Sequence, residues 1–269
     1  MGGTRATCFG RSSAVNALAV KESTRCFFER DSDVPLHRRA CAEALGTSLL
    51  TIAAAGSSFG AEQLFGRNSP AVLIVSAAAP ASALAALVLT FGFVSGGHFN
   101  PLITVLQWMG RERRLDCTLA YVFAQSAGAL LGIWLVSAIF GPIRLAGPSA
   151  VVSWNLVFSE VAATARLMTI VFGCARGGHA ETGGFAVGLW LAAAILATPS
   201  GSYANPALTI GATFAQGPLA LLPSSAAAYI GGQILGALLA FVLIWICFPK
   251  SDAVRTTSSD SRLADRGMP

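Results

Sequence analysis

The chain has 269 residues, of which 54% are hydrophobic and only 12% are charged. A soluble globular domain carries roughly twice that share of charged residues, so this composition excludes an ordinary soluble protein. The net charge of +5 requires no nucleic-acid partner, because Lys and Arg concentrate beside apolar segments, as in membrane proteins. The six scattered cysteines favour neither a disulfide framework nor a zinc site. We also find no nucleophile set, metal-ligand cluster or cofactor loop, so we expect no enzyme activity and no cofactor.

Six apolar segments are long enough, or nearly so, to cross a membrane as helices. A crossing requires about 20 residues for a hydrocarbon core of roughly 30 Å. The fifth segment is the shortest, at about 17 residues. These segments do not alternate between polar and apolar residues, as the strands of a β-barrel would, and helices satisfy their own backbone groups in lipid. We therefore predict an all-helical membrane protein with spans at residues 40–60, 72–96, 117–140, 153–174, 183–199 and 225–248.

The placement of positive charge predicts the orientation of these spans. With six spans, fifteen of the 18 Lys and Arg residues fall on one side of the membrane. Arg67 and Arg144 fall on the other side, and Arg166 lies inside the fourth span. The positive-inside rule therefore predicts cytoplasmic tails at residues 1–37 and 249–269, in a multi-pass protein of the cell (plasma or inner) membrane. The first tail lacks the apolar region of a secretory signal.

Two Asn-Pro dipeptides lie in the two halves of the chain, each after a Gly/Ser-rich stretch. They occur in the sequences Asn100-Pro101-Leu102 and Asn205-Pro206-Ala207. Asn is a strong N-cap, and Pro suits the first helical position because its missing N–H would have no partner there. Each dipeptide begins a segment too short to cross the bilayer. We predict two half-helices whose positive dipole ends lie inside the membrane, which is typical of a pore.

An internal repeat predicts how the two halves are arranged. Residues 120–131 recur as residues 228–239, with seven of twelve positions identical. Each half (about 38–140 and 151–248) contains three spans and one half-helix, and an odd number of spans inverts the second half. The half-helices then enter from opposite faces and meet near the midplane. A secondary transporter with broken helices is an alternative, but its coupling ion would need a site beyond the two membrane carboxylates, Glu43 and Glu160.

This order of motifs resembles the aquaporin (major intrinsic protein) family over about residues 38–248. The resemblance implies a six-helix bundle around one pore per subunit, assembled in the lipid bilayer as a homotetramer. It implies that Glu43 and Glu160 accept hydrogen bonds from backbone N–H groups of the two half-helix loops. Gln125 and Gln233 would brace the helix interfaces, and His98 would line the cytoplasmic vestibule. The two motif asparagines would donate hydrogen bonds to a passing solute.

The expected constriction departs from the common pattern of this family. Most members carry Arg three residues after the second motif Asn, where this chain has Leu208. The remaining filter positions align with Pro80, Ser202 and, counting back from the motif, Ala193; counting from a glycine upstream selects Ile195 instead. Such a filter is wide and apolar, and suits small uncharged solutes such as glycerol, urea or undissociated arsenous acid. The surrounding sequence is similar to a bacterial subgroup that lacks the filter Arg, some members of which are linked to arsenic resistance.

Two other functions remain open from the sequence. A water-selective channel would need aromatic, His and Arg filter residues, which we do not find. A poorly conducting structural membrane protein is compatible with the bulk of Leu102 in the first motif and with Pro80. Arg166 has three possible positions: the pore, a subunit interface, or a lipid-facing position from which it reaches the membrane surface.

Overall fold

The computed structural model describes residues 34–141, 152–179 and 182–248, and these residues form an all-helical bundle. Residues 1–33 of the first predicted tail lie outside this part of the chain, as do Arg144 and the whole of the second predicted tail. Five helices have the length and composition of membrane spans: α1 (Leu36–Phe65), α2 (Pro70–Ser95), α4 (Leu115–Phe140), α5 (Trp154–Arg176) and α8 (Pro223–Cys247). The shorter elements are α6 (Gly183–Ala197), α3 (Pro101–Met109), α7 (Pro206–Ala212) and the 3₁₀ turn η2 (Gly217–Leu219).

The predicted fifth span corresponds to α6, which has 15 residues and ends earlier than the predicted residue 199. Its C-cap, Thr198, has an extended backbone (φ −127°, ψ 134°). Thr198 precedes Pro199, and the residue before a proline is disfavoured in the helical region. The chain therefore leaves the helix here and enters the loop that leads to α7.

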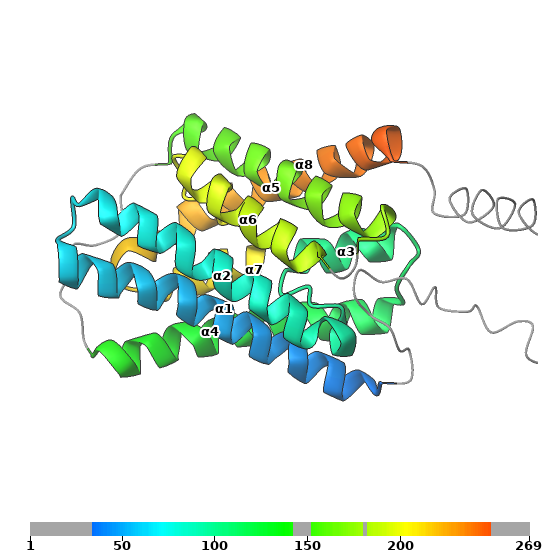
Figure 1. The fold of residues 1–269 in the computed structure, drawn as a ribbon, viewed down its shortest axis with the longest axis horizontal. Helices are drawn as coiled ribbons and strands as arrows, with labels where there is room; N and C mark the ends of the chain where they lie inside the picture. The colour runs from blue at the N-terminus through cyan, green and yellow to red at the C-terminus, as the bar shows by residue number, and fades with distance from the viewer. Residues whose placement is uncertain (1–33, 142–151, 180–181, 249–269) are drawn as a thin grey trace, which may run out of the picture.

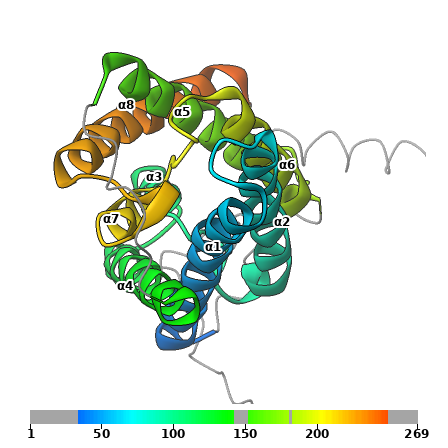
Figure 2. The same cartoon turned by 90° about the vertical axis from the view of Figure 1, so that its left-hand side faces the viewer.

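The helices form two equivalent groups around a common centre. In Figure 1 the long helices run along the long axis of the molecule, and the end view in Figure 2 shows them around α3 and α7. In the first half α1 packs against α4 and α2; in the second, α5 packs against α8 and α6. The equivalent pairs α1–α4 and α5–α8 are the arrangement that the sequence repeat predicts.

Two glycines of the repeated segment allow these helix pairs to approach closely. A Cβ at Gly128 on α4 would meet the carbonyl oxygen of Ala44 on α1. A Cβ at Gly236 on α8 would meet the carbonyl oxygen of Val161 on α5. Small residues at helix contacts let backbones approach in membrane proteins. Both halves carry glycine at the point where the two helices of the pair touch.

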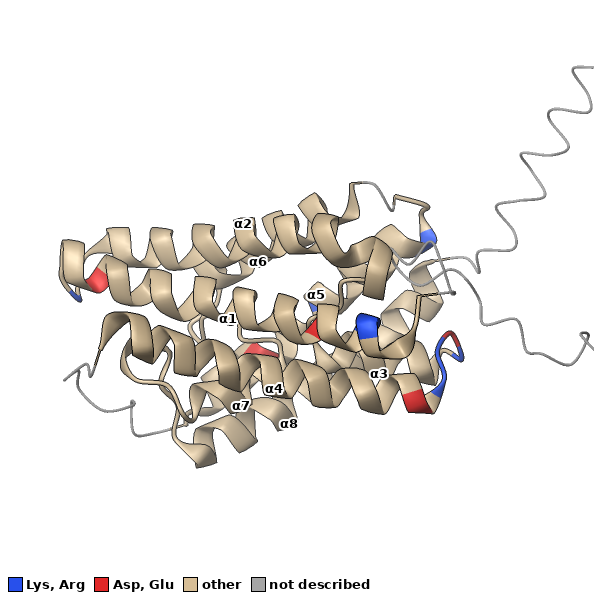
Figure 3. Cartoon of the chain, turned by 90° about the horizontal axis from the view of Figure 1, so that it is seen from below, with Lys and Arg blue, Asp and Glu red and all other residues tan. Residues whose placement is uncertain are grey.

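Charged residues lie mainly at the two ends of the bundle (Figure 3). Described arginines gather at the end where α1 begins and where α3 and α5 finish, whereas Arg67 lies between α1 and α2 at the opposite end. Between the ends, Glu43 and Glu160 are fully buried. Arg166 also lies between the ends, within α5, but unlike the two glutamates it is exposed.

Candidate functional site: a pore between two half-helices

The two half-helices meet at their N-termini through the motif asparagines. The Asn100 side-chain oxygen accepts a hydrogen bond from the Leu102 N–H (3.0 Å), and the Asn205 oxygen accepts one from the Ala207 N–H (3.0 Å). Both asparagines are therefore N-caps followed by Pro, as their sequences predict. Capping fixes the orientation of each amide group, so its nitrogen is held toward the opposite half of the molecule.

The two caps also bind each other's loops. Asn100 Nδ2 donates to the carbonyl oxygen of Ala204, and Asn205 Nδ2 donates to that of Phe99, both at 2.8 Å. Phe99 and Ala204 have positive φ angles of 48° and 44°, which are uncommon for residues other than glycine and cluster at functional sites. This backbone conformation turns each carbonyl toward the opposing asparagine. Each amide keeps a second N–H, and both asparagines line a cavity.

Glu43 holds the loop before α3. Its carboxylate accepts hydrogen bonds from the backbone N–H groups of His98 (3.0 Å) and Phe99 (2.7 Å) and from the side chains of Ser95 (2.6 Å) and Gln125 (2.7 Å). A buried carboxylate is costly unless such donors satisfy it. The structure therefore brings Glu43 and Gln125 together at the first loop.

Glu160 occupies the equivalent position in the second half. It accepts hydrogen bonds from the backbone N–H groups of Tyr203 (3.1 Å) and Ala204 (2.9 Å) and from Gln233 Nε2 (2.7 Å). Because the N–H groups of this loop point at the carboxylate, its carbonyl groups can face elsewhere, and that of Ala204 accepts the hydrogen bond from Asn100. Glu160 and Gln233 thus lie at the loop before α7 as the family resemblance implies.

Two threonines that the sequence reasoning missed complete these networks. Gln125 Nε2 also donates to Thr104 Oγ1 (3.0 Å), and Gln233 Nε2 also donates to Thr209 Oγ1 (2.8 Å). Each threonine lies four residues after a motif asparagine, one helical turn into its half-helix. This shared spacing was the available signal. The threonines tie the half-helices to α4 and α8 and so keep the caps at the centre.

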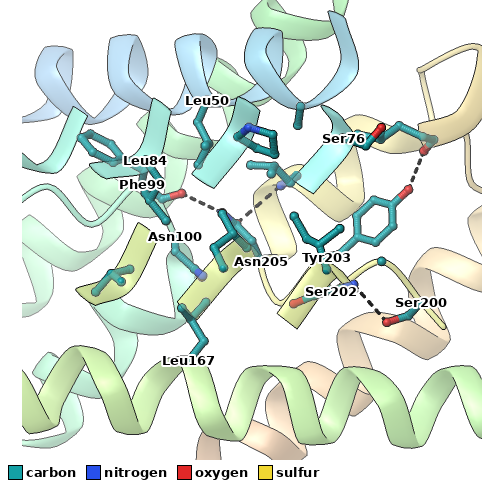
Figure 4. A pocket seen from close by; sticks show the side chains of 18 of the residues that line it. Leu50, Ser76, Leu84, Phe99, Asn100, Leu167, Ser200, Ser202, Tyr203 and Asn205 are labelled. Carbon is teal, nitrogen blue, oxygen red and sulfur yellow. Dashed lines mark hydrogen bonds between the residues drawn. The ribbon is translucent and has the colours of Figure 1, made fainter. Parts of the chain in front are cut away.

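A cavity of about 230 Å³ extends on both sides of the asparagine pair. Figure 4 shows Asn100 and Asn205 at its middle, with Leu84 and Leu167 beside them and Ser200 and Ser202 farther along. Most of its lining is aliphatic, including Leu50, Leu84, Val88, Leu167, Val171 and Leu191. The polar groups are few and separated along the cavity, which is the arrangement of a path rather than of a deep polar pocket.

Three of the four predicted filter residues line this cavity: Pro80, Ser202 and Leu208. The preferred fourth residue, Ala193, is wrong, because it is exposed on α6 and the cavity is lined by Ile195 instead. Ile195 follows Leu191 by one helical turn, so both face the cavity, whereas a residue two positions after Leu191 faces nearly the opposite side. These four lining residues, Pro80, Ile195, Ser202 and Leu208, include no Arg, His or aromatic side chain.

His98 and Ser202 both line the cavity. His98 Nδ1 is 2.8 Å from Thr104 Oγ1, and its ring lies against Tyr121 at a centroid distance of 5.5 Å. His98 Nε2 and Ser202 Oγ are buried, and neither has a hydrogen-bond partner within the described part of the chain. Both atoms are therefore enclosed by the protein, although other atoms of the two residues line the cavity.

Two residues that the sequence left open lie away from the cavity. Leu102 is buried in the hydrophobic core that packs α3 against the neighbouring helices. It is not among the described residues that line the cavity, so its bulk fills the core. Arg166 is also outside that lining and is exposed on the outer side of α5.

Comparison with known proteins places this geometry in a family. The profile of the family described as Major intrinsic protein matches residues 31–198. The aquaglyceroporin AqpS of Rhizobium meliloti (strain 1021) is 35% identical over 230 residues, which cover 84% of this chain and 97% of the relative. Nodulin-26 of Glycine max is 30% identical over 258 residues, covering 92% and 93%.

A solved structure has the same fold. The aquaglyceroporin from Plasmodium falciparum superposes with a TM-score of 0.67 at 18% sequence identity, over 79% of this chain and 98% of that one. This likeness confirms the predicted all-helical membrane fold, and the family consists of channels, which agrees with the expectation that the chain is not an enzyme. The chain therefore belongs to the major intrinsic protein family of multi-pass membrane channels.

Proposed function

We propose that this protein is a passive channel for small uncharged solutes, including water, glycerol-like polyols and undissociated arsenous acid. The observation that carries the proposal is that Leu208, at the position where most family members carry Arg, lines the cavity together with Pro80, Ile195 and Ser202. An arginine side chain would narrow the path and hold a water molecule. The naming of the relative AqpS as an aquaglyceroporin supports the same class of solute.

The polar groups along the cavity define the order of contacts for such a solute. A hydroxyl group of the solute passes Ser202, then meets the second amide N–H groups of Asn100 and Asn205, then passes His98; all four residues line the cavity. The aliphatic walls between these points offer no replacement for the hydration shell of an ion, so ions pay a desolvation cost. The positive ends of α3 and α7 converge on the asparagines and repel cations there.

We further propose that the arginine-rich end of the bundle faces the cytoplasm, in accordance with the positive-inside rule. His98 then lies on the cytoplasmic side of the asparagine pair and Ser202 on the outer side. In this proposal the channel works as a homotetramer in the plasma or inner membrane, with one pore per subunit. Its partners are the bilayer and the solutes.

The test is stopped-flow light scattering on proteoliposomes, with water, glycerol and arsenous acid compared against empty vesicles. We expect flux of all three above control. Leu208→Arg should lower glycerol and arsenous acid flux about tenfold, a barrier increase of about 1.4 kcal/mol, and lower water flux less. Leu208→Met is the matched control, because it keeps an apolar side chain of similar volume. Equal losses for all solutes would contradict the filter assignment, water flux alone would favour a water-selective channel, and no flux would favour a structural protein.

A further inference from the structure

Tyr203 is an aromatic residue that lines the cavity but occupies none of the four filter positions. It follows the filter residue Ser202 in the loop before α7, and both residues line the cavity. In Figure 4 its ring lies on the same side of the asparagine pair as Ser200 and Ser202, and its hydroxyl group points away from that pair, toward the end of the cavity where Ser76 lies. In the proposed orientation this is the outer side, so a solute that enters from outside passes the ring of Tyr203.

Three contacts hold the Tyr203 ring in one position. The backbone N–H donates to Glu160 Oε1 (3.1 Å), and the hydroxyl group donates to the carbonyl oxygen of Leu219 (2.7 Å). The ring also lies against Tyr229 on α8, with centroids 5.8 Å apart and planes at 66°, which is the edge-to-face arrangement that aromatic pairs prefer. Because the side chain is fixed at both ends, the ring leaves its position only when the hydrogen bond to Leu219 breaks.

The acceptor of that hydrogen bond is itself anchored. Leu219 ends the turn η2, which contacts α1, and its side chain packs against buried residues of α1 and α4 that include Phe59 and Ile133. The backbone N–H of Leu221 donates to the last carbonyl group of α7 (3.0 Å). The hydroxyl group therefore connects the Tyr203 ring, from the second half of the chain, to a turn that is packed against the first half.

We propose that Tyr203 is a second determinant of solute size, which acts on the outer side of the filter. The cavity at this end is enclosed by both halves, since Leu73 and Ser76 of α2 and Pro218 and Leu219 of η2 also line it. A flexible side chain would move aside for a large solute, whereas the fixed ring narrows the entrance for every solute. The ring therefore excludes polyols that are longer and bulkier than glycerol. This inference rests on the proposed function, because it concerns the entry of small uncharged solutes.

The ratio of two fluxes tests the role of the ring. Stopped-flow light scattering on proteoliposomes measures the entry of glycerol and of xylitol, a longer linear polyol, through full-length protein. Tyr203→Ala should raise the xylitol-to-glycerol ratio at least about tenfold, since a change of one methylene in a fitted site already alters discrimination by about that factor. Tyr203→Phe keeps the ring without its hydrogen bond to Leu219, and should raise the ratio less than Tyr203→Ala does. A loss of folded protein lowers both fluxes together and leaves the ratio unchanged.

Phe214→Ala is the matched control, because Phe214 is an exposed aromatic residue just after α7 and is not among the described residues that line the cavity. It should keep the wild-type ratio. If Tyr203→Ala does not fold, as judged by gel filtration, Tyr203→Leu takes its place, because leucine keeps an apolar contact with Tyr229; the ratio should again rise. An unchanged ratio in the folded variant, or an equal rise in Phe214→Ala, would overturn the inference.

The same experiment separates this inference from the proposed function. Wild-type protein that conducts glycerol, with an unchanged ratio in Tyr203→Ala, would overturn the role of the ring alone. Wild-type protein that conducts only water would contradict the proposed function. In that case glycerol entry through Tyr203→Ala would support the ring as the determinant of size, and its absence would overturn that role. No flux of any solute through either protein would overturn both.

Discussion

Removing the carboxylate of Glu160 should destabilise the second loop by an amount that its hydrogen bonds define. Glu160→Ala leaves three N–H groups without an acceptor: the backbone N–H groups of Tyr203 and Ala204, and the one amide N–H of Gln233 that faces the carboxylate. A buried unsatisfied donor costs about 1–3 kcal/mol, so the substitution should lower the free energy of unfolding by about 3–9 kcal/mol. Glu160→Gln can place its nitrogen at the oxygen that faces Tyr203 alone, which leaves one donor unsatisfied and costs about 1–3 kcal/mol.

Denaturation in mixed detergent micelles, followed by tryptophan fluorescence, measures this difference. Hydrogen exchange should also accelerate at Tyr203 and Ala204 in Glu160→Ala, with little change in α4. Asp116→Asn is the control, because Asp116 and Arg114 form an exposed ion pair (3.1 Å) worth less than about 1 kcal/mol. If Glu160→Gln costs as much as Glu160→Ala, or if exchange in the loop is unchanged, the bracing role of Glu160 is wrong.

Three further predictions concern packing, the pore and pH. Gly236→Ala should destabilise the protein by about 1–3 kcal/mol, because its Cβ would meet the carbonyl oxygen of Val161; Gly231→Ala on the same helix, where the Cβ has open space, should stabilise by up to about 1 kcal/mol, and thermal unfolding compares the two. Asn205→Asp should reduce solute flux in proteoliposomes at least severalfold, because an oxygen replaces the nitrogen that donates to a loop carbonyl (2.8 Å); wild-type flux would remove this amide from the path. Burial raises the pKa of Glu112, in the loop after α3, against the lowering effect of nearby arginines. The folded state therefore holds this proton more tightly, and Glu112→Gln should be more stable than wild type near neutral pH, with the gain disappearing as the pH falls below the ordinary glutamate pKa; a gain that is equal at both pH values would contradict this reasoning.

Much of the local structure could be predicted because its causes are local. The Asn-Pro dipeptides set the starts of α3 and α7, since a cap and a fixed proline φ act within one helical turn. Apolar length predicted the spans, with differences of a few residues at their ends. The ends of α6 show why such differences arise: Pro199 halts the helix, whereas a count of apolar residues continues past it.

The register of α6 shows what spacing from a distant motif cannot predict. Counting back from Asn205 assumes a loop of constant length, and it selected Ala193. The packing of α6 against α2 and α5 decides which face meets the cavity, and that face carries Leu191 and Ile195. Residues two positions apart on a helix face nearly opposite sides. An error of two residues in the assumed loop length therefore selects a residue on the outer surface in place of one that lines the cavity.

The sequence by itself determined the class of protein, the inverted repeat and the two capped half-helices. These follow from composition, from short-range capping and from self-similarity, which involve no knowledge of distant contacts. Only the tertiary structure decided that Asn100 and Asn205 each bind the loop of the other half, over separations of 104 and 106 residues. It also decided that Thr104 and Thr209 join the glutamine networks and that Arg166 faces outward. The physical reason is that packing between helices sets the rotation and depth of each helix. One sequence pattern is compatible with several rotations and depths.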